Sequence, residues 1–379
     1  MTMELPNGTK RLLSLTPFNS FQLLELPKKK MKKEHILIIR FSALGDVAMA
    51  VPVVYSLAKT YPQVRITVLS RGFARPFFED LAPNVNFMEA DIKGEYRGIK
   101  GLNALYRRLV AKKPTAVADF HGVLRSAYLR MRFNLERFRV AHINKHRNER
   151  RALTSATAKR MVQLPTSFEN YANVLARLGY PVDLKFTSIF GVEKGNLNLL
   201  PAAIGPHNSG EQWIGIAPFA AHKGKVYPPE RMERVIDMIE EKYPHCRIFL
   251  FGRGIDEDRT FTSWCSKHGR CLYVGKHLES MYQELVLMSN LDVMVSMDSA
   301  NMHMASITGT PVVSVWGATH PYAGFMGWHQ SEDNAVQLPL ACRPCSIFGN
   351  RPCRRGDFAC MTGITPEMIF EKIDKLLTL

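Results

Sequence analysis

One segment of the chain, RFSALGDV, carries a carboxylate directly after an apolar run, HILII. Gly45 in this segment permits a tight turn, and Asp46 stands where a helix would begin. At that position an aspartate either caps the helix or acts as a general base toward a hydroxyl within hydrogen-bond reach. The segment lacks the G-x-G-x-x-G pattern, which disfavours a dinucleotide-dependent oxidoreductase.

A second segment, VSMDSANMH, is suited to binding an anion. Asp298, Ser299 and Ala300 come directly after an expected strand and open an expected helix. Their small size leaves backbone N–H groups free at the positive end of the helix dipole. His303 lies one turn further on, where a histidine either packs in the core or faces a ligand.

A third segment, HKGKVYPPE, holds two lysines in the loop after another expected strand. Lys223 and Lys225 stand just before a helix that begins with proline. Beside an anion-binding helix end, two ammonium groups predict a clamp for a diphosphate.

These residues need a scaffold, and the chain alternates short apolar runs with helical segments in both halves. This alternation predicts an α/β protein with two Rossmann-like halves, each with a parallel sheet that binds ligands at the carboxyl ends of its strands. Thr166 and Glu169 form the capping box of an expected helix. The expected strands lie in residues 35–41, 65–70, 85–90, 115–120, 213–219, 246–252, 271–275, 291–297 and 311–317.

Composition shifts along the chain predict the domain boundaries. We expect residues 1–30 to be a flexible N-terminal extension and residues 31–194 to form the first domain. A linker rich in Gly, Pro and Asn is expected over residues 195–210, followed by a second domain over residues 211–379. That domain should end in a helix capped by Thr365.

The charge of the chain is uneven. The formal net charge is +16, and residues 93–160 alone contain 18 Lys and Arg against 4 Asp and Glu. This segment is either a solvated basic face or a surface for an anionic partner, such as a phosphorylated substrate, an acidic membrane or nucleic acid. No apolar stretch is long enough to span a bilayer, and no signal-peptide core is present, so we expect a cytoplasmic protein.

Read together, the segments resemble glycosyltransferase family 9, the ADP-heptose:lipopolysaccharide heptosyltransferases, over residues 31–379. The family's patterns are R-x-S-x-L-G-D, K-x-[WY]-P and D-[ST]-[GA]-x-x-H-x-A, and their order and spacing are also matched. The matching residues are Arg40, Ser42, Leu44, Gly45, Asp46, Lys225, Tyr227, Pro228, Asp298, Ser299, Ala300, His303 and Ala305.

The resemblance implies a GT-B fold, in which two facing Rossmann-like domains enclose the active site. Asp46 would deprotonate the acceptor hydroxyl, and the sugar carbon would be inverted. The donor would be held by the second domain, and departure of its nucleoside diphosphate would be assisted without a divalent metal. The implied donor-binding residues are Lys225, Asp298, Ser299, Ala300 and His303.

A fourth segment, DFHGVLRSA, resembles the family's D-x-Q-G-x-x-R-S-A, with His121 in place of glutamine. It implies that Arg125 binds the acceptor. A nucleotide sugar and an anionic acceptor of the Kdo-lipid A type are the implied partners, with peripheral attachment to the inner face of the inner membrane.

Two alternatives to heptose transfer stay open. One is a GT-B transferase for another nucleotide sugar, for which Glu257 is a candidate ribose or base contact. The other is a non-catalytic basic protein that binds RNA or a membrane. The chain has no RNA-binding signature, so no nucleic-acid partner is expected.

Four of the seven cysteines form a cluster spaced C-x2-C-x7-C-x6-C. In a reducing compartment this pattern predicts either a structural zinc site or reduced free thiols, and favours an iron–sulfur cluster less. The family resemblance implies that no cofactor is required for catalysis. The candidate ligands lie in a Cys-rich loop over residues 342–360 and are Cys342, Cys345, Cys353 and Cys360.

Overall fold

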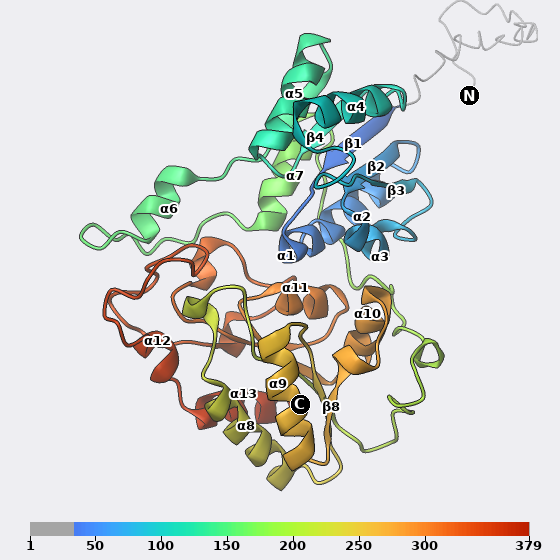
Figure 1. Cartoon of the computed structure of the whole chain (residues 1–379). Helices are drawn as coiled ribbons and strands as arrows, with labels where there is room; N and C mark the ends of the chain where they lie inside the picture. Colours follow the sequence, from blue (N-terminus) through green and yellow to red (C-terminus); the bar gives the residue numbers. More distant parts are fainter. Residues whose placement is uncertain (1–33, 379) are drawn as a thin grey trace, which may run out of the picture. The chain divides into compact units, whose positions relative to one another are not determined.

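The computed structural model describes residues 34–378, so the extension predicted over residues 1–30 lies outside the described part. The described residues contain two parallel sheets, each covered by helices (Figure 1). The first sheet has the strand order β3-β2-β1-β4-β5. Its strands are β1 (His35–Ile39), β2 (Arg65–Ser70), β3 (Val85–Glu89), β4 (Ala116–Asp119) and β5 (Arg139–His142).

The second sheet has the strand order β11-β10-β9-β6-β7-β8, and all its paired strands are parallel. Its strands are β6 (Trp213–Ala217), β7 (Arg247–Leu250), β8 (Cys271–Tyr273), β9 (Val293–Met297), β10 (Val312–Val315) and β11 (Ala335–Val336).

All nine predicted strands are present, and two further strands were missed. Strand β5 lies at a sheet edge and is partly exposed, so its sequence, RVAH, lacks the apolar run of a buried strand. Strand β11 has only two residues and also lies at an edge.

The helices of the first half cover both faces of its sheet. Helices α2 and α7 pack on one face, and α4 and α5 bury Leu105, Leu109, Leu129 and Phe133 in a separate core on the other. The helices are α1 (Leu44–Ala48), α2 (Val51–Thr60), α3 (Arg75–Phe78), α4 (Gly98–Val110), α5 (Leu124–Leu135), α6 (Arg147–Leu153) and α7 (Ser167–Arg177).

The helices of the second half include the predicted C-terminal helix, which packs against α8. They are α8 (Pro229–Lys242), α9 (Ile255–Lys267), α10 (Met281–Asn290), α11 (Ala300–Ile307), α12 (Ala359–Thr362) and α13 (Pro366–Leu377). The short 3-10 turns are η1 (Gly72–Ala74), η2 (Leu197–Leu199), η3 (Lys223–Lys225), η4 (Val274–Lys276), η5 (Pro321–Ala323) and η6 (Glu332–Asn334).

Two helix starts have the caps that the sequence predicts. The Thr166 side chain accepts a hydrogen bond from the Glu169 backbone N–H at 3.2 Å, and the Glu169 carboxylate accepts one from the Thr166 N–H at 2.7 Å. The Thr365 hydroxyl accepts a hydrogen bond from the Met368 N–H at the start of α13. Both caps satisfy N–H groups that would otherwise have no partner.

The two halves meet through apolar packing and backbone hydrogen bonds. Trp328 of the second half packs edge-on against Phe168 of α7, with ring centroids 4.9 Å apart. The backbone N–H of Ser167 donates to the Gly324 carbonyl at 3.0 Å. Helices α1 and α11 are also in contact, at the centre of Figure 1. The carboxyl ends of both sheets therefore face a shared region.

The chain also crosses between the halves in an extended segment. The Ile189 N–H donates to the Ile307 carbonyl of α11, and the Gly195 N–H donates to the Ser289 hydroxyl of α10. This part of the chain is thus anchored on the second half before residue 196. Within residues 34–378 no helix is long and apolar enough to cross a membrane.

Candidate active site

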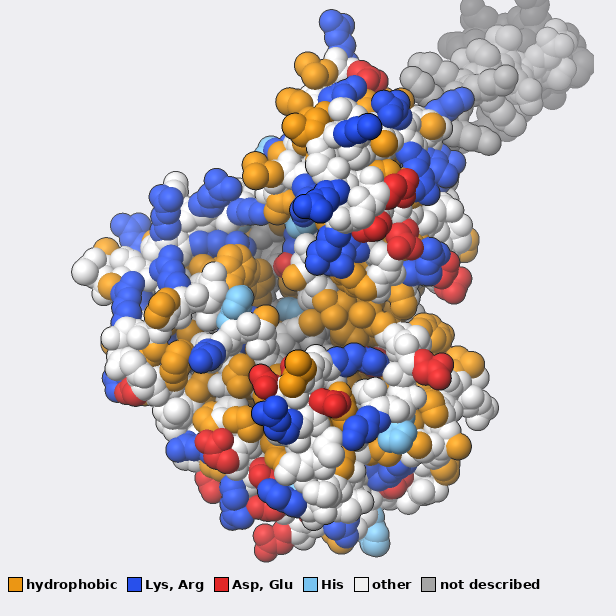
Figure 2. Space-filling view, viewed as in Figure 1, with side chains coloured by type: hydrophobic (Ala, Val, Ile, Leu, Met, Phe, Trp, Pro, Cys, Tyr) orange, Lys and Arg blue, Asp and Glu red, His pale blue; other side chains and the backbone are white. Residues whose placement is uncertain are grey.

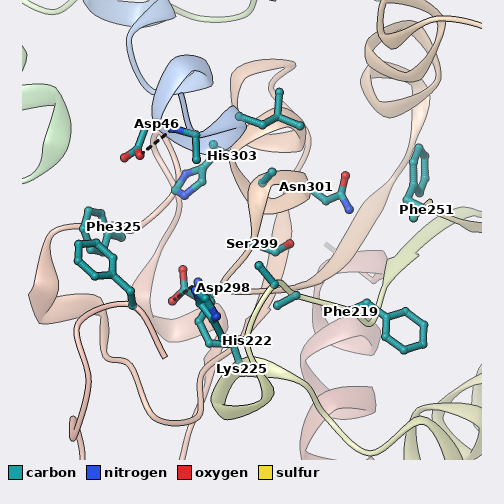
Figure 3. Close-up of a pocket in the computed structure, with 18 of the residues that line it drawn as sticks. Asp46, Phe219, His222, Lys225, Phe251, Asp298, Ser299, Asn301, His303 and Phe325 are labelled. Carbon is teal, nitrogen blue, oxygen red and sulfur yellow. Dashed lines mark hydrogen bonds and ion pairs between the residues drawn. The ribbon is translucent and has the colours of Figure 1, made fainter. Parts of the chain in front are cut away.

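A cavity of about 550 Å³ lies where the two halves meet, and both halves contribute to its walls. The first half supplies α1 with Asp46, and the second supplies η3, the start of α11 and several loops. In Figure 3, Asp46 lies at one end of this cavity and Phe219 and Phe251 at the other, with Ser299 and Asn301 between them. A cavity of this size accommodates a nucleotide sugar.

Asp46 is the third residue of α1, so it is not the N-cap residue, although its side chain takes part in capping this helix. Ala43 occupies the cap position, and its N–H donates to Asp46 Oδ2 at 3.3 Å. The same oxygen forms an ion pair with the Nη2 of Arg40. The Asp46 side chain is 31% exposed, so the carboxylate is held on one side and open to the cavity on the other.

Arg40 is buried, and a backbone carbonyl holds its guanidinium in place. Its Nη1 donates to the Phe120 carbonyl at 2.6 Å. The phenol of Tyr171 donates to the backbone carbonyl of Asp46 at 3.1 Å, which attaches α1 to α7. These contacts limit the rotation of the Asp46 side chain, because a buried guanidinium with two anchored nitrogens has little freedom.

Gly45 is needed because two helices approach closely at this residue. The tight turn expected from the sequence does not explain why glycine is needed here. Its backbone is not in the left-handed region. A Cβ at this position would lie 2.7 Å from Cδ2 of His303 and 3.3 Å from the Cα of Ala300. Glycine therefore lets α1 of the first half touch α11 of the second.

His303 is both buried and part of the cavity wall, which joins the two alternatives left open by the sequence. Burial lowers its pKa to about 4, so the imidazole is neutral near pH 7. Its Nδ1 has no hydrogen-bond partner among the described residues. A neutral imidazole in this position can accept or donate one hydrogen bond to a ligand.

The start of α11 offers free backbone donors to the cavity. Ser299 is the N-cap residue, but its side chain makes no capping hydrogen bond and lies 3.2 Å from the Ser296 hydroxyl. Ser299, Ala300 and Asn301 all line the cavity. Uncapped N–H groups at a helix N-terminus bind anions such as phosphate.

Lys225 reaches this helix start, as the sequence predicts. Its Nζ lies 3.2 Å from Oδ2 of Asp298, and both side chains are largely buried. One of the two lysines of the predicted clamp is therefore paired with a carboxylate in this structure. Lys223 is exposed and does not line the cavity, so the two lysines are not equivalent.

The far end of the cavity is aromatic and apolar. Phe219 follows β6, Phe251 follows β7, and Glu257 comes from the first turn of α9. Glu257, the candidate ribose or base contact, thus lies in the cavity wall. The sequence did not single out the two phenylalanines, because each extends an apolar strand.

A second cavity of about 190 Å³ opens on the first-half side of Asp46. Among its lining residues are Arg40, Lys145 and Arg150. Burial and the neighbouring cations, Arg40 among them, lower the pKa of both Lys145 and Arg150. The Nε of Arg150 has no hydrogen-bond partner within residues 34–378. In the part of the chain that the structure describes, no acidic side chain forms an ion pair with Lys145 or Arg150, whereas Arg40 is paired with Asp46. The two unpaired cations favour an anion in this cavity.

The sequence missed Lys145 and Arg150 because the segment around α6 has no apolar period and reads as one charged run. Arg150 is identified only by its surroundings. Its guanidinium lies over the rings of Phe325 and Phe348, at 5.2 and 5.7 Å from their centroids. Both phenylalanines belong to loops of the second half, which no sequence spacing connects to α6.

The DFHGVLRSA segment forms the end of β4 and the start of α5. His121 lines the second cavity, and burial lowers its pKa to about 3. Buried Asp119 accepts the N–H groups of His121 and Gly122, both at 2.9 Å, and so shapes this loop. Arg125 is exposed at the start of α5 and lines neither cavity, so its acceptor role stays a prediction.

The four clustered cysteines surround a third, small cavity of about 20 Å³. Within residues 34–378, however, no group of three or more His, Cys, Asp or Glu side chains has an arrangement that could hold a metal ion. The thiols are gathered, yet they do not form a ligand set as they stand. The Cys-rich loop also supplies Ile347 and Phe348 to the wall of the large cavity.

Comparison with known proteins identifies the family. A family model described as glycosyltransferase family 9 (heptosyltransferase) matches residues 102–351, well over half of the chain. The chain belongs to this family. The matched stretch includes Lys225 and α11, whereas Asp46 lies before it, so the position of Asp46 rests on the geometry of the cavity.

Relatives in the family cover most of the chain. Lipopolysaccharide heptosyltransferase 1 of Campylobacter coli is 23% identical over 304 residues, which are 76% of this chain and 85% of that protein. The crystal structure of a family 9 glycosyl transferase from Veillonella parvula has a TM-score of 0.68 at 18% identity, with 92% of this chain and 98% of that chain covered.

The structure of the ADP-heptose lipopolysaccharide heptosyltransferase II of E. coli has a TM-score of 0.64 at 18% identity and covers 91% of this chain and 98% of that chain. At such identity these structures establish the fold, which is the predicted GT-B architecture. Membership of the family makes the chain a glycosyltransferase, which sets aside the non-catalytic alternative.

Proposed function

We propose that the protein is an inverting heptosyltransferase that moves heptose from ADP-heptose to a lipopolysaccharide core acceptor of the Kdo-lipid A type. The observation that carries this proposal is the shared cavity. One wall has a free helix N-terminus beside Lys225, which suits a diphosphate, and the facing wall has the open carboxylate of Asp46. Two of the named relatives, those of Campylobacter coli and E. coli, are lipopolysaccharide heptosyltransferases, which supports the choice of sugar and acceptor.

In this reaction Asp46 takes the proton of the acceptor hydroxyl as its oxygen attacks the anomeric carbon. The bond from that carbon to the diphosphate breaks on the opposite side, and ADP leaves. The contacts of Oδ2 with Arg40 and Ala43 leave Oδ1 to receive the proton. Attack from the Asp46 side, with the leaving group toward the second half, gives inversion.

The donor would lie along the cavity with its nucleobase near Phe219 and Phe251. Aromatic rings are good partners for a base, and Glu257, which lines the same cavity, would contact a ribose hydroxyl. The diphosphate would meet the N–H groups of Ser299 to Asn301. Lys225 would turn from Asp298 toward the phosphates as negative charge develops on the leaving group.

The acceptor would enter from the first half, where the second cavity adjoins Asp46. Lys145 and Arg150 would receive a carboxylate or phosphate of the acceptor and so bring its hydroxyl to the base. This assignment gives the cations of α6 and its preceding loop a direct role. Arg125, exposed nearby on α5, would contact a more distant anionic group.

The experiment is a transfer assay with purified protein, ADP-heptose and a Kdo-lipid A acceptor, followed by ADP release and by mass spectrometry of the product. We expect one heptose added per acceptor, and rates that persist in EDTA. A panel of nucleotide sugars in the same assay tests the alternative donor. Turnover with another nucleotide sugar and none with ADP-heptose would contradict the proposal, as would loss of activity that magnesium restores.

We further propose that the enzyme works on the inner face of the inner membrane, where a lipid-linked acceptor is made, with no nucleic-acid partner. A structural zinc ion at the four clustered cysteines is a separate proposal. It would require the thiols around the small cavity to draw together on binding the ion.

A further inference from the structure

Helix α5 is apolar on two opposite faces. Ser126, Leu129 and Phe133 are buried against the first sheet. On the opposite side, Leu124, Tyr128, Met131 and Leu135 recur at intervals of four, three and four residues, which places them in one line along the helix. We call these four residues the α5 ridge.

The α5 ridge is exposed over its full length. Leu124 is 90% exposed, Met131 48% and Leu135 73%. Tyr128 is partly exposed, and its hydroxyl donates to the side chain of Asn103 on α4 at 2.8 Å. A surface helix of a soluble domain normally turns a polar face outward, so a continuous apolar line requires a partner.

The ridge also continues onto the neighbouring helix. Ile99 of α4 is 68% exposed and lies one turn before Asn103, on the side of α4 that contacts α5. Contacts of α4 with α5 keep the two helices together. The apolar surface is therefore broader than one helix.

Positive charge surrounds this surface. Arg125 and Arg132 lie two turns apart along one edge of the α5 ridge, and Lys100 and Arg97 are exposed beside Ile99. Figure 2 shows Lys and Arg side chains interspersed with hydrophobic ones over the region of α4 and α5. Residues 93–160 carry 18 basic and 4 acidic residues, so the field here is strongly positive.

We propose that the α5 ridge, with Ile99, inserts into the headgroup region of a bilayer that contains anionic phospholipids. Apolar side chains enter between the headgroups, and the flanking arginines and lysines meet lipid phosphates. This proposal rests on the proposed function in one respect: a lipid-linked acceptor requires the enzyme to work at a membrane. Vesicle binding itself needs neither donor nor acceptor.

A second copy of the chain is a less suitable partner. Two ridges in contact would bring together two sets of mainly basic side chains, with exposed Glu136 as the acidic neighbour of Leu135 on each copy. The excess of like charges at such an interface opposes association. An anionic bilayer offers an apolar layer for the ridge side chains and negative headgroups for the flanking cations. Leu124, at the start of α5, follows directly on the loop that lines the second cavity, so the ridge begins near the acceptor entrance.

The test is co-sedimentation of the full chain with vesicles of phosphatidylcholine alone or with added phosphatidylglycerol. The variant Met131→Gln/Leu135→Gln removes the outer part of the ridge. The control Leu199→Gln/Val192→Gln changes two exposed apolar residues on the second half, which are 48% and 94% exposed. All four sites are exposed, so thermal melts should show that each variant is folded.

We expect wild type and control to bind the phosphatidylglycerol vesicles, more weakly at high salt, and to bind phosphatidylcholine poorly. For the ridge variant, the dissociation constant with anionic vesicles should rise by about tenfold or more. The variant lacks two apolar side chains that would be buried in the bilayer. Equal binding by ridge variant and wild type would overturn the proposal, and so would a wild-type dimer that the ridge variant converts to monomer.

Activity separates this proposal from the proposed function. With a water-soluble acceptor lacking its acyl chains, the ridge variant should transfer heptose at the wild-type rate, because Met131 and Leu135 line neither cavity. With the acceptor embedded in vesicles its rate should fall. No transfer by any form of the protein would count against the proposed function, and the vesicle-binding result would still decide the role of the ridge.

Discussion

The buried guanidinium of Arg40 forms an ion pair with Oδ2 of Asp46, and both residues belong to the same short segment after β1. The ring of Tyr171 lies 5.8 Å from this guanidinium, and its hydroxyl holds the backbone of Asp46. The ion pair between Arg40 and Asp46 is thus held by contacts with Tyr171 as well as by its own charges. Asp46 lines the large cavity and is oriented by Arg40, which lines only the second cavity.

This arrangement predicts that Asp46→Asn keeps the shape of the site and loses its chemistry. The amide cannot take the proton of the acceptor, so kcat should fall on the order of 100-fold or more. Calorimetric titration should give an ADP affinity within about twofold of wild type, because the diphosphate site lies on the other half. A kcat close to that of wild type would leave Asp46 with only its contacts at the start of α1.

The Lys225 side chain predicts a loss of donor affinity. Lys225→Met removes the cation that would meet the diphosphate, so ADP should bind about tenfold more weakly. The substitution also leaves Asp298 buried without its counter-ion, which should lower the free energy of unfolding by about 1–3 kcal/mol. Lys223→Met is the matched control, since Lys223 is exposed, and it should change neither quantity. Equal ADP affinity for both variants would place the clamp elsewhere.

The contact of α1 with α11 predicts that Gly45→Ala is harmful although alanine favours helices. The added Cβ would lie 2.7 Å from the imidazole of His303. We expect a loss of about 1–3 kcal/mol in the free energy of unfolding, measured in urea, together with slower transfer. Gly269→Ala is the control, because a Cβ there meets no atom within 4 Å. Combining Gly45→Ala with His303→Ala should recover part of the stability, and no recovery would contradict the clash.

The buried histidines predict an acid-sensitive fold. Burial lowers the pKa of His303 to about 4 and that of His121 to about 3, below the usual 6.5. Between these values and pH 6.5 the unfolded chain binds more protons than the folded one. Stability is therefore full above pH 6.5 and falls as the pH drops toward 4, by up to about 1.4 kcal/mol per pH unit for each histidine. Thermal melts across this range should show a shallower decline for His121→Gln, and an unchanged decline would contradict the prediction for this residue.

The cysteine cluster predicts a metal content that can be measured directly. Protein purified without chelator should contain about one zinc ion per chain, and Cys345→Ser should lose both the ion and thermal stability. Cys265→Ser, outside the cluster, is the control and should keep the metal. Metal-free wild-type protein with the same melting temperature as Cys345→Ser would identify the four side chains as ordinary thiols.

The fold was largely predictable because its central strands are continuous apolar runs, as in HILII of β1 and VMVSM of β9. Edge strand β5 was not, since a partly exposed strand need not be apolar. The site residues Asp46, Lys225 and His303 were predictable because each follows a strand whose carboxyl end faces the cavity. Their contacts with one another were not, since the pairing of Lys225 with Asp298 and the approach of Gly45 to His303 depend on how strands and helices of different segments pack.

The second cavity is the clearest example of a site that the spacing of residues in the sequence does not predict. Lys145 and Arg150 come from a charged run, and only packing distinguishes them from the other cations of that run. Arg150 is covered by Phe325 and Phe348, which lie about 175 and 200 residues further along the chain. A side chain selected by such distant neighbours has no local signal.

The Cys-rich loop contributes to the walls of both the small cavity and the large cavity. Phe348 and Ile347 lie between Cys345 and Cys353 in the chain, and they also form part of the wall of the large cavity. A Cβ on Gly349 would lie 2.4 Å from the Lys225 side chain, so this loop packs directly on the residue proposed to contact the diphosphate. We expect ordering of this loop at its thiols to strengthen binding of the proposed nucleotide donor, and linkage then requires the bound nucleotide to order the loop by the same free energy. We therefore expect these cysteines to react more slowly with an alkylating reagent as the proposed donor site is filled.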